Sequence, residues 1–267
     1  MTTEALRDHG LAELAAAIDH LGRHGSHVHT GIHQARKAIR RTRALLALVA
    51  ADVGPGAKLI DRELRRANRR LSPLRDAHAL VETLDRLRTK ARDEPTRTAL
   101  AHARGIALRR RAAMAHGPGF AQALQHERAI LVTLRAGLSG LAWDNVATST
   151  VVDALAASAR KADAARDRAC AHDDDQDWHR WRRRMRRLSQ QHRVALAAAL
   201  PLSDAGFDKH VTEQLGVLQD LSLLVAHCGK DSPFGESRAA LRRFAERALA
   251  RQRKRIRSVV APVSSVP

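Results

Sequence analysis

The pattern of apolar and polar positions predicts a chain made entirely of α helices. Apolar residues recur every three to four positions, and no clear segment alternates between apolar and polar residues. Ala, Leu and Arg dominate, and all three are strong helix formers, whereas aromatic residues make up 3% of the chain and Tyr is absent. Nine helix-breaking segments predict nine or ten helices: 22–25, 54–56, 72–73, 93–95, 117–119, 138–144, 173–177, 200–201 and 229–235.

Polar residues near several of these breaks are suited to begin a helix. A short side-chain oxygen at the N-cap position accepts a hydrogen bond from a free backbone N–H of the first turn. On this basis we predict four N-caps: Ser26, Asp144, Asp177 and Asp204.

Two segments of the first half of the chain reappear, in the same order, in the second half. HQARKAIRR at 33–41 is echoed by HRWRRRMRR at 179–187, an offset of 146, and LSPLRDAHAL at 71–80 by LGVLQDLSLL at 215–224, an offset of 144. Two matched landmarks in order indicate a duplicated unit. We therefore expect one domain, 1–267, with internal repeats over about 1–142 and 143–267, neither of which need be stable alone.

The first landmark is amphipathic in both copies. At 3.6 residues per turn, Ile32, Ala35, Ile39, Leu46 and Val49 fall on one side of the first copy, and its basic residues fall on the other. In the second copy the apolar side holds Trp178, Trp181, Met185 and Leu188. Each helix is therefore expected to have an apolar back that packs in a bundle and a basic front.

The charge of the whole chain changes the meaning of these basic fronts. The sequence has 47 basic and 28 acidic residues, a formal charge of +19, and 40 of the basic residues are arginines. The planar guanidinium matches phosphate oxygens with two parallel hydrogen bonds. A genome rich in G and C also raises the Arg and Ala content of its proteins together. The positions of the arginines are therefore stronger evidence for phosphate binding than their number.

Each basic front is long enough to contact several phosphates of an extended chain. From His33 to Arg43 it runs about 15 Å at 1.5 Å per residue. Each pair of like charges three or four positions apart destabilises the helix by about 0.2–0.5 kcal/mol, and a bound polyanion would remove this repulsion. We expect binding of inorganic polyphosphate, or a similar linear polyanion, through His33, Arg36, Lys37, Arg40, Arg41, Arg43, Arg69, Arg75, His179, Arg182, Arg183, Arg186, Arg187, Arg193 and Lys209.

Other chemistries find less support in the residues. His33 and His179 head the two basic fronts and are interpreted as phosphate contacts, because the surrounding cations would repel a metal. Asp76 and Asp220, in the second landmark, are assigned to orienting arginines or capping a helix rather than to catalysis. His172-Asp173 resembles the metal-binding pair of phosphohydrolases, but it opens an acidic run that is typical of a turn. No phosphate-binding glycine loop or nucleophile elbow occurs.

These observations predict a binding protein with no cofactor, no metal and no catalytic site. Cys170 and Cys228 are the only cysteines, and no apolar run approaches the roughly 20 residues that cross a bilayer. A cytoplasmic protein without membrane association is the simplest expectation.

The repeated His-x-x-Arg-x-x-x-Arg-Arg helix, the Leu-x-x-Leu-Arg-Asp element and the basic all-α character together resemble the CHAD family, the conserved histidine α-helical domain. The resemblance covers nearly the whole chain. It implies two four-helix bundles related by a pseudo-two-fold axis, a basic central surface, polyphosphate binding and association with polyphosphate granules, where granule-associated proteins would be further partners. The motif residues of the family match His33, Arg36, Arg40, Arg41, Arg43, Arg75, Asp76, His179, Arg182, Arg186, Arg187 and Asp220.

The second repeat departs from this motif. Ser189 stands where the first repeat has Arg43, and Gln219 replaces the basic partner of Asp220, while Lys37 occupies a position that is usually apolar. We therefore expect an asymmetric surface with the better matched half in the first repeat. Two alternatives remain open: a nucleic-acid-binding module, with weak non-specific binding in any case, and a metal-dependent phosphohydrolase.

Overall fold

The computed structural model describes residues 2–200 and 208–260, and this part of the chain contains ten α helices, three short 3-10 helices and no strand. The all-α prediction is confirmed. The α helices are α1 (Thr2–Leu21), α2 (Val28–Val49), α3 (Gly56–Arg70), α4 (Ser72–Lys90), α5 (Glu94–Ala115), α6 (Phe120–Ser139), α7 (Thr148–His172), α8 (Asp175–Ala197), α9 (Lys209–His227) and α10 (Arg238–Val260). The 3-10 helices are η1 (Gly25–His27), η2 (Trp143–Asn145) and η3 (Gly235–Ser237).

Each predicted break separates two helices within the described residues, although its boundaries shift by a few positions. In the acidic run only Asp173 and Asp174 lie outside helices, and the remaining acids already belong to α8. Asp173 ends α7 in the left-handed region, with φ of 55°. Pro201, in the break before α9, lies outside the described residues.

The predicted caps are wrong wherever the structure describes them. Asp174, rather than Asp177, caps α8 by accepting hydrogen bonds from the backbone N–H groups of Gln176 at 2.8 Å and Asp177 at 3.3 Å. Asp208 caps α9 in the same way, and the predicted Asp204 lies outside the described residues.

Ser26 and Asp144 lie inside the 3-10 helices η1 and η2, and neither α2 nor α7 has a side-chain cap. Several polar residues compete at each break, and the backbone conformation at the helix start decides which of them has the required geometry.

The chain divides into two compact units, each composed of two segments. Among the described residues, unit 1 contains 2–75 and 115–200, and unit 2 contains 76–114 and 208–260. Each unit therefore takes helices from both predicted repeats, and the pseudo-two-fold relation between the repeats stays a prediction.

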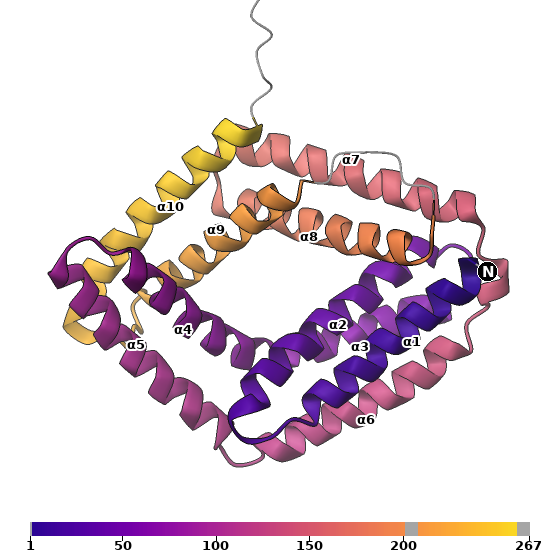
Figure 1. Ribbon diagram of the computed structural model, residues 1–267, viewed down its shortest axis with the longest axis horizontal. Helices are drawn as coiled ribbons and strands as arrows, with labels where there is room; N and C mark the ends of the chain where they lie inside the picture. Colours follow the sequence, from indigo (N-terminus) through magenta and orange to yellow (C-terminus); the bar gives the residue numbers. More distant parts are fainter. Residues whose placement is uncertain (1, 201–207, 261–267) are drawn as a thin grey trace, which may run out of the picture. The chain divides into compact units, whose positions relative to one another are not determined.

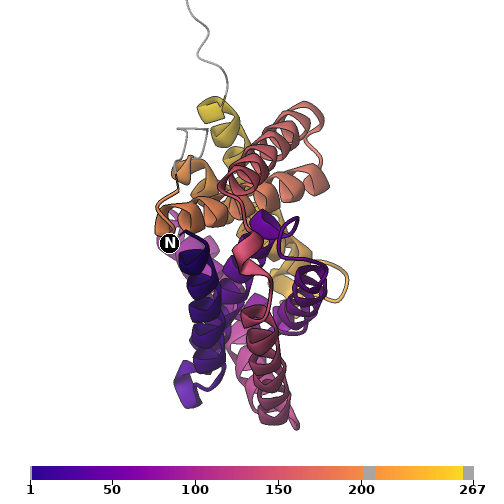
Figure 2. The same cartoon turned by 90° about the vertical axis from the view of Figure 1, so that its right-hand side faces the viewer.

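Unit 1 is a four-helix bundle with a helical hairpin packed on it (Figure 1). Contacts run from α1 to α2, from α2 to α3, from α3 to α6 and back to α1. Helices α7 and α8 run side by side in both views (Figure 1, Figure 2), and both pack against α2. The two helices that carry the repeated basic motif, α2 and α8, therefore lie in one unit and in contact.

The apolar backs of α2 and α8 are buried, as predicted. Ile32, Ala35, Ile39, Leu46 and Val49 of α2 belong to the core of unit 1. On α8 the buried side chains are Trp178, Trp181, Met185 and Leu188. Burial of these faces removes apolar surface from water and turns the opposite, basic face of each helix outward.

Buried polar contacts fix further helices of unit 1. Glu127 of α6 is only 4% exposed and accepts two hydrogen bonds from Arg70 at the end of α3, one of them at 3.0 Å. Gln191 of α8, which is fully buried, donates to the carbonyl of Ala44 on α2 at 3.5 Å.

Unit 2 contains most of α4, together with α5, α9 and α10. Helices α9 and α10 pack against each other, and Gln252 of α10 donates to the side chain of Gln214 on α9 at 2.6 Å. Arg86 of α4 reaches Asp220 of α9 at 3.3 Å, and Arg104 of α5 reaches Asp85 of α4 at 2.5 Å. Polar contacts thus connect all four helices of unit 2.

None of the helices in the described part of the chain is long and apolar enough to cross a membrane.

Candidate functional site: an arginine cavity in unit 1

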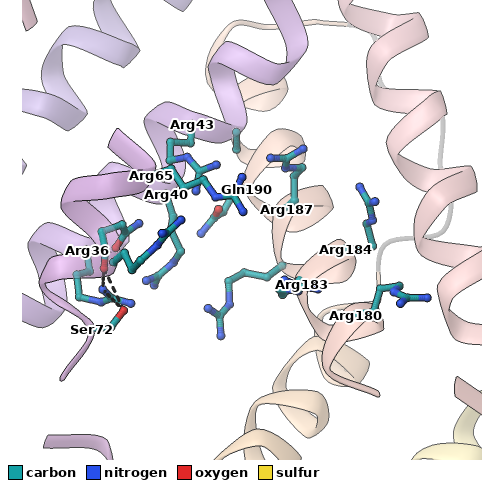
Figure 3. A pocket seen from close by; sticks show the side chains of 14 residues that line it. Arg36, Arg40, Arg43, Arg65, Ser72, Arg180, Arg183, Arg184, Arg187 and Gln190 are labelled. Atoms are coloured by element: carbon teal, nitrogen blue, oxygen red, sulfur yellow. Dashed lines mark hydrogen bonds between the residues drawn. The ribbon is translucent and has the colours of Figure 1, made fainter. Parts of the chain in front are cut away.

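The basic fronts of α2 and α8 meet at a cavity of about 600 Å³ in unit 1 (Figure 3). We call it the arginine cavity, because ten of its lining residues are arginines: Arg36, Arg40, Arg43, Arg65, Arg69, Arg180, Arg183, Arg184, Arg186 and Arg187. Ala44, Asn68, Ser72 and Gln190 complete the lining, so none of the described lining residues is acidic. A net charge of one sign within a walled cavity focuses its field on anions.

Helices α2 and α3 form one wall of the arginine cavity, and α8 forms the other. In Figure 3 Arg36, Arg40, Arg43 and Arg65 lie on one side, and Arg183 extends from α8 toward them. The seven steps from Arg180 to Arg187 span about 10 Å of α8, and the seven from Arg36 to Arg43 an equal length of α2. The two walls therefore present guanidinium groups over a distance that exceeds one phosphate.

Two arginines of the lining have carboxylate partners behind the cavity wall. Arg43 donates to both carboxylate oxygens of Asp61 on α3, at 2.8 and 3.3 Å, and Arg180 contacts Asp177 one turn earlier in α8, at 3.2 Å. Such pairs hold a long side chain in one orientation while its other N–H groups stay available to a ligand.

Arg36 is held by the junction between α3 and α4. Its terminal nitrogen Nη1 donates to the backbone carbonyl of Asn68 and to the hydroxyl of Ser72, the latter at 2.9 Å. The carbonyls at the end of a helix lack partners within the helix, so this contact both satisfies one of them and fixes the guanidinium at the cavity wall.

Arg40 lies in an unfavourable electrostatic position in the cavity. Burial is the main reason that the pKa of its guanidinium lies well below its usual value, and Arg186, Arg36, Arg75 and Arg182 lower the pKa further. Its Nε atom is buried and makes no hydrogen bond. The charge of Arg40 is thus less stable in the folded protein than in the unfolded chain, and an anion in the cavity would reverse that penalty.

Arg187 shows the same effect to a smaller degree. Burial lowers the pKa of its guanidinium, Arg43 and Arg184 lower it further, and Asp61 opposes them. Asp61 thus partly compensates both Arg43 and Arg187.

Seven of the fifteen predicted binding residues line the arginine cavity: Arg36, Arg40, Arg43, Arg69, Arg183, Arg186 and Arg187. Arg75 and Arg182 do not line it but act electrostatically on Arg40. Arg182 is only 8% exposed, so its charge acts from within the protein.

Three more of the predicted residues form a separate cluster in unit 1. Burial lowers the pKa of Lys37, with Arg41 and Arg193 among the further causes. Arg41 points to α1, where its Nη1 lies 2.9 Å from a carboxylate oxygen of Glu13. This cluster does not line the arginine cavity.

The remaining predicted residues also lie outside the cavity lining. His33 is partly buried on α2, and His179 is exposed on α8. Lys209 belongs to unit 2, where it pairs with Glu213 at 3.8 Å.

Asp76 and Asp220 both lie in unit 2. The side chain of Asp220 accepts hydrogen bonds from Arg86 at 3.3 and 3.4 Å. Asp76 acts on His227, whose pKa is lowered by burial and by Arg110 and raised by Asp76.

His172 and Asp173, which resemble a metal-binding pair in the sequence, make contacts with residues of α8 in the structure. Asp173 accepts a hydrogen bond from the indole of Trp178 at 2.8 Å, and His172 contacts Asp177 at 3.3 Å. Among the residues described, no group of three or more His, Cys, Asp or Glu side chains is arranged to hold a metal ion.

Arg65, Arg180 and Arg184 line the cavity but were not among the predicted binding residues. On α8 the cavity faces a direction roughly 60° from His179, at 3.6 residues per turn. A sequence search for the Arg180-x-x-Arg183-Arg184-x-x-Arg187 spacing, without His179 as the reference, would have found this side of α8.

Comparison with known proteins agrees with this architecture. The chain resembles the solved crystal structure of the CHAD domain from the plant Ricinus communis with a TM-score of 0.60, at 20% sequence identity, over 97% of this chain and 88% of that one. No curated protein matches it significantly. The family model of the CHAD domain matches residues 12–229, which include α2, α8 and the whole lining of the arginine cavity. The chain therefore belongs to the CHAD domain family.

Proposed function

We propose that this protein binds inorganic polyphosphate, or a closely similar linear polyanion, in the arginine cavity of unit 1. The observation that carries the proposal is the convergence of ten arginines from three helices on one cavity whose described lining contains no acid. Guanidinium groups offer paired donors that match phosphate oxygens, and they stay charged at any physiological pH.

The distribution of these charges favours a chain of phosphates over a single ion. The arginines occupy about 10 Å of both α2 and α8, so one phosphate would leave most of them uncompensated. Arg40, with its buried and unpaired Nε atom and its lowered pKa, shows that the cost of assembling the charges is present in the unliganded protein. A linear polyanion supplies one negative charge after another along this path.

Nucleic acid is the main competing ligand, because any basic surface attracts phosphodiester chains. Proteins that bind single strands usually stack the bases on aromatic side chains. Here Trp143, Trp178 and Trp181 are all buried, and no aromatic residue is among those that line the cavity. This favours polyphosphate, which has no bases.

We propose binding without turnover. Enzymes that cleave phosphoryl groups normally hold divalent cations with carboxylates beside the substrate. Asp61 and Asp177, which contact arginines of the lining, are already paired with Arg43 and Arg180. We further propose that the protein is cytoplasmic and associates with polyphosphate granules and with the proteins found there.

Titration with polyphosphates of graded length, at near-physiological salt and with DNA and RNA as competitors, tests the proposal. The cavity variant Arg40→Gln, Arg183→Gln, Arg186→Gln and Arg187→Gln removes four lining charges. Each lost charged hydrogen bond is worth about 1.5–3 kcal/mol, so two of them already weaken binding by at least about 100-fold. Tighter binding of nucleic acid than of polyphosphate would reject the proposed ligand.

A matched control separates the cavity from the general charge of the protein. Arg160, Lys161, Arg166 and Arg168 of α7 are four cations of the same unit that do not line the cavity. Their replacement by Gln removes an equal charge and is expected to change affinity only slightly. An equal loss in both variants would place the site elsewhere.

Incubation of the protein with polyphosphate and Mg²⁺ or Mn²⁺ tests for turnover. Unchanged chain length and no released phosphate are expected.

A further inference from the structure

Helix α10, at the end of unit 2, carries a second group of cations that the arginine cavity does not include. The helix contains nine basic residues and a single acid, Glu246. Four of the basic residues recur at intervals of four, four and three positions, which places them on one face of the helix. We call them the α10 cation row: Arg243, Arg247, Arg251 and Lys254.

All four side chains of the row are exposed. Glu246 is engaged by Arg242 at 2.8 Å, and the described part of the structure pairs no member of the row with an acidic group. Some basic residues elsewhere in unit 2 do have such partners: Arg97 pairs with Glu94 at 2.6 Å. Like charges at these spacings repel one another, so the row carries a repulsion that no acidic pair in the described structure relieves.

The opposite face of α10 is already occupied, which restricts the kind of partner. Leu241, Ala245, Leu249 and Ile256 are buried, and α10 packs against α9. A membrane-bound amphipathic helix needs a free apolar face to enter the lipid, and α10 has none to offer. No aromatic side chain belongs to the row, so a ligand read by base stacking is not favoured either.

We propose that the α10 cation row is a second polyphosphate-binding site, distinct from the arginine cavity. The row extends about 16 Å along the helix, which suits an extended chain of phosphates rather than a single ion. Its four exposed cations bind more weakly than the ten of the cavity, because solvent screens exposed charges more strongly. The identity of the ligand rests on the proposed function, whereas the existence of a polyanion site on α10 does not.

The test uses the full chain and a short linear polyphosphate just long enough to cover the row, about 16 Å. Four proteins are titrated by calorimetry: the wild type, the cavity variant described above, the row variant Arg243→Gln, Arg247→Gln, Arg251→Gln and Lys254→Gln, and the combination of both. The wild type is expected to show one tight and one weak site, the row variant only the tight one, the cavity variant only the weak one, and the combination none.

Salt dependence gives a second readout. Each cation that neutralises a phosphate of a single strand contributes about −0.7 to the slope of log K against log salt, so the weak site is expected to have a slope of about −3. As a control, Arg88, Lys90, Arg92 and Arg97 of the same unit are replaced by Gln. This change removes an equal charge and should leave both sites present.

The outcomes separate the two proposals. If the cavity variant loses all binding, the α10 site is refuted and the proposed function stands. If the cavity variant keeps all binding and the row variant loses it, the cavity is refuted and the α10 site stands. Loss of the weak site in the control as well would mean that general charge, rather than the α10 cation row, is responsible.

Discussion

Replacement of Arg40 by Met is expected to make the unliganded protein more stable and its complex weaker. Arg40 lies among four other arginines, its Nε atom is buried without a hydrogen bond, and burial lowers the pKa of its guanidinium. A lowered pKa of a base means that its charged form is less stable in the folded than in the unfolded state. Met has a similar length and no charge, so it removes the penalty and keeps most of the packing.

The size of the effect follows from the partial burial of Arg40. Replacement of a buried ion pair or triad by apolar residues of similar volume is often stabilising, by about 1–4 kcal/mol. Because Arg40 lines a cavity open to solvent, we expect the lower part of this range, about 1–2 kcal/mol. For a chain of this size, 1 kcal/mol raises Tm by about 2–4 °C, so the expected increase is about 2–8 °C.

The change in Tm is measured by tryptophan fluorescence, because Trp143, Trp178 and Trp181 are buried in unit 1 and report its unfolding. Thermal unfolding is followed at low and high salt, without ligand and with short polyphosphate. The gain in Tm should shrink at high salt, which screens the repulsion. Saturating polyphosphate should stabilise the wild type more than the variant, because stabilisation by a ligand grows with its affinity.

A control replaces Arg62 of α3 by Met. The side chain of Arg62 is 59% exposed and contacts Glu63 at 3.4 Å, so the change in stability should stay within about 0.5 kcal/mol. The reasoning would be refuted if Arg40→Met lowered Tm without ligand, or if it left polyphosphate affinity unchanged.

Three further predictions concern the stability of the fold and are checked by chemical or thermal unfolding. Arg70→Ala leaves the carboxylate of buried Glu127 without its cation and is expected to lower the free energy of unfolding by about 3–5 kcal/mol. Glu127→Gln should lower it less, because the cation that it leaves behind, Arg70, is half exposed. Equal losses of stability in the two variants would contradict this prediction. Asp174→Ala removes the cap of α8 and should cost about 0.5–2 kcal/mol, whereas Asp144→Ala should cost less than about 0.5 kcal/mol. Burial lowers the pKa of His9, so the unfolded chain takes up the proton first as pH falls below about 6.5, and stability drops with it. His9→Gln should reduce this drop, and an unchanged pH profile would rule out a contribution from His9.

The helices and their orientation were largely predictable from the sequence. The spacing of apolar residues and the glycines, prolines and acidic run predicted nine or ten helices, and the described part of the chain contains ten α helices. The buried backs of α2 and α8 follow from the same periodicity, since a face of Ile, Leu and Trp leaves water whatever the partner is. The repeated motif also identified α2 and α8, the two helices that contribute most of the lining of the arginine cavity.

The side of each helix that faces the cavity was decided by the tertiary structure. A basic front spans a wide arc, and the sequence contains no information about where a second helix crosses it. The contact between α2 and α8 places Arg36, Arg40 and Arg43 at the cavity, whereas the packing of α1 against α2 brings Arg41 to Glu13. On α8 the same contact selects the side of Arg180 and Arg184 and leaves His179 outside the lining.

The sequence by itself thus determined the secondary structure, the charge and the type of ligand expected, because these depend on residue type and local spacing. Only the tertiary structure decided which charges act together. Arg65 and Arg69 join the cavity because α3 packs beside α2, and two helices separated by more than a hundred residues meet there. Such contacts depend on how the helix faces interlock in three dimensions, and the periodicity of a single helix does not specify them.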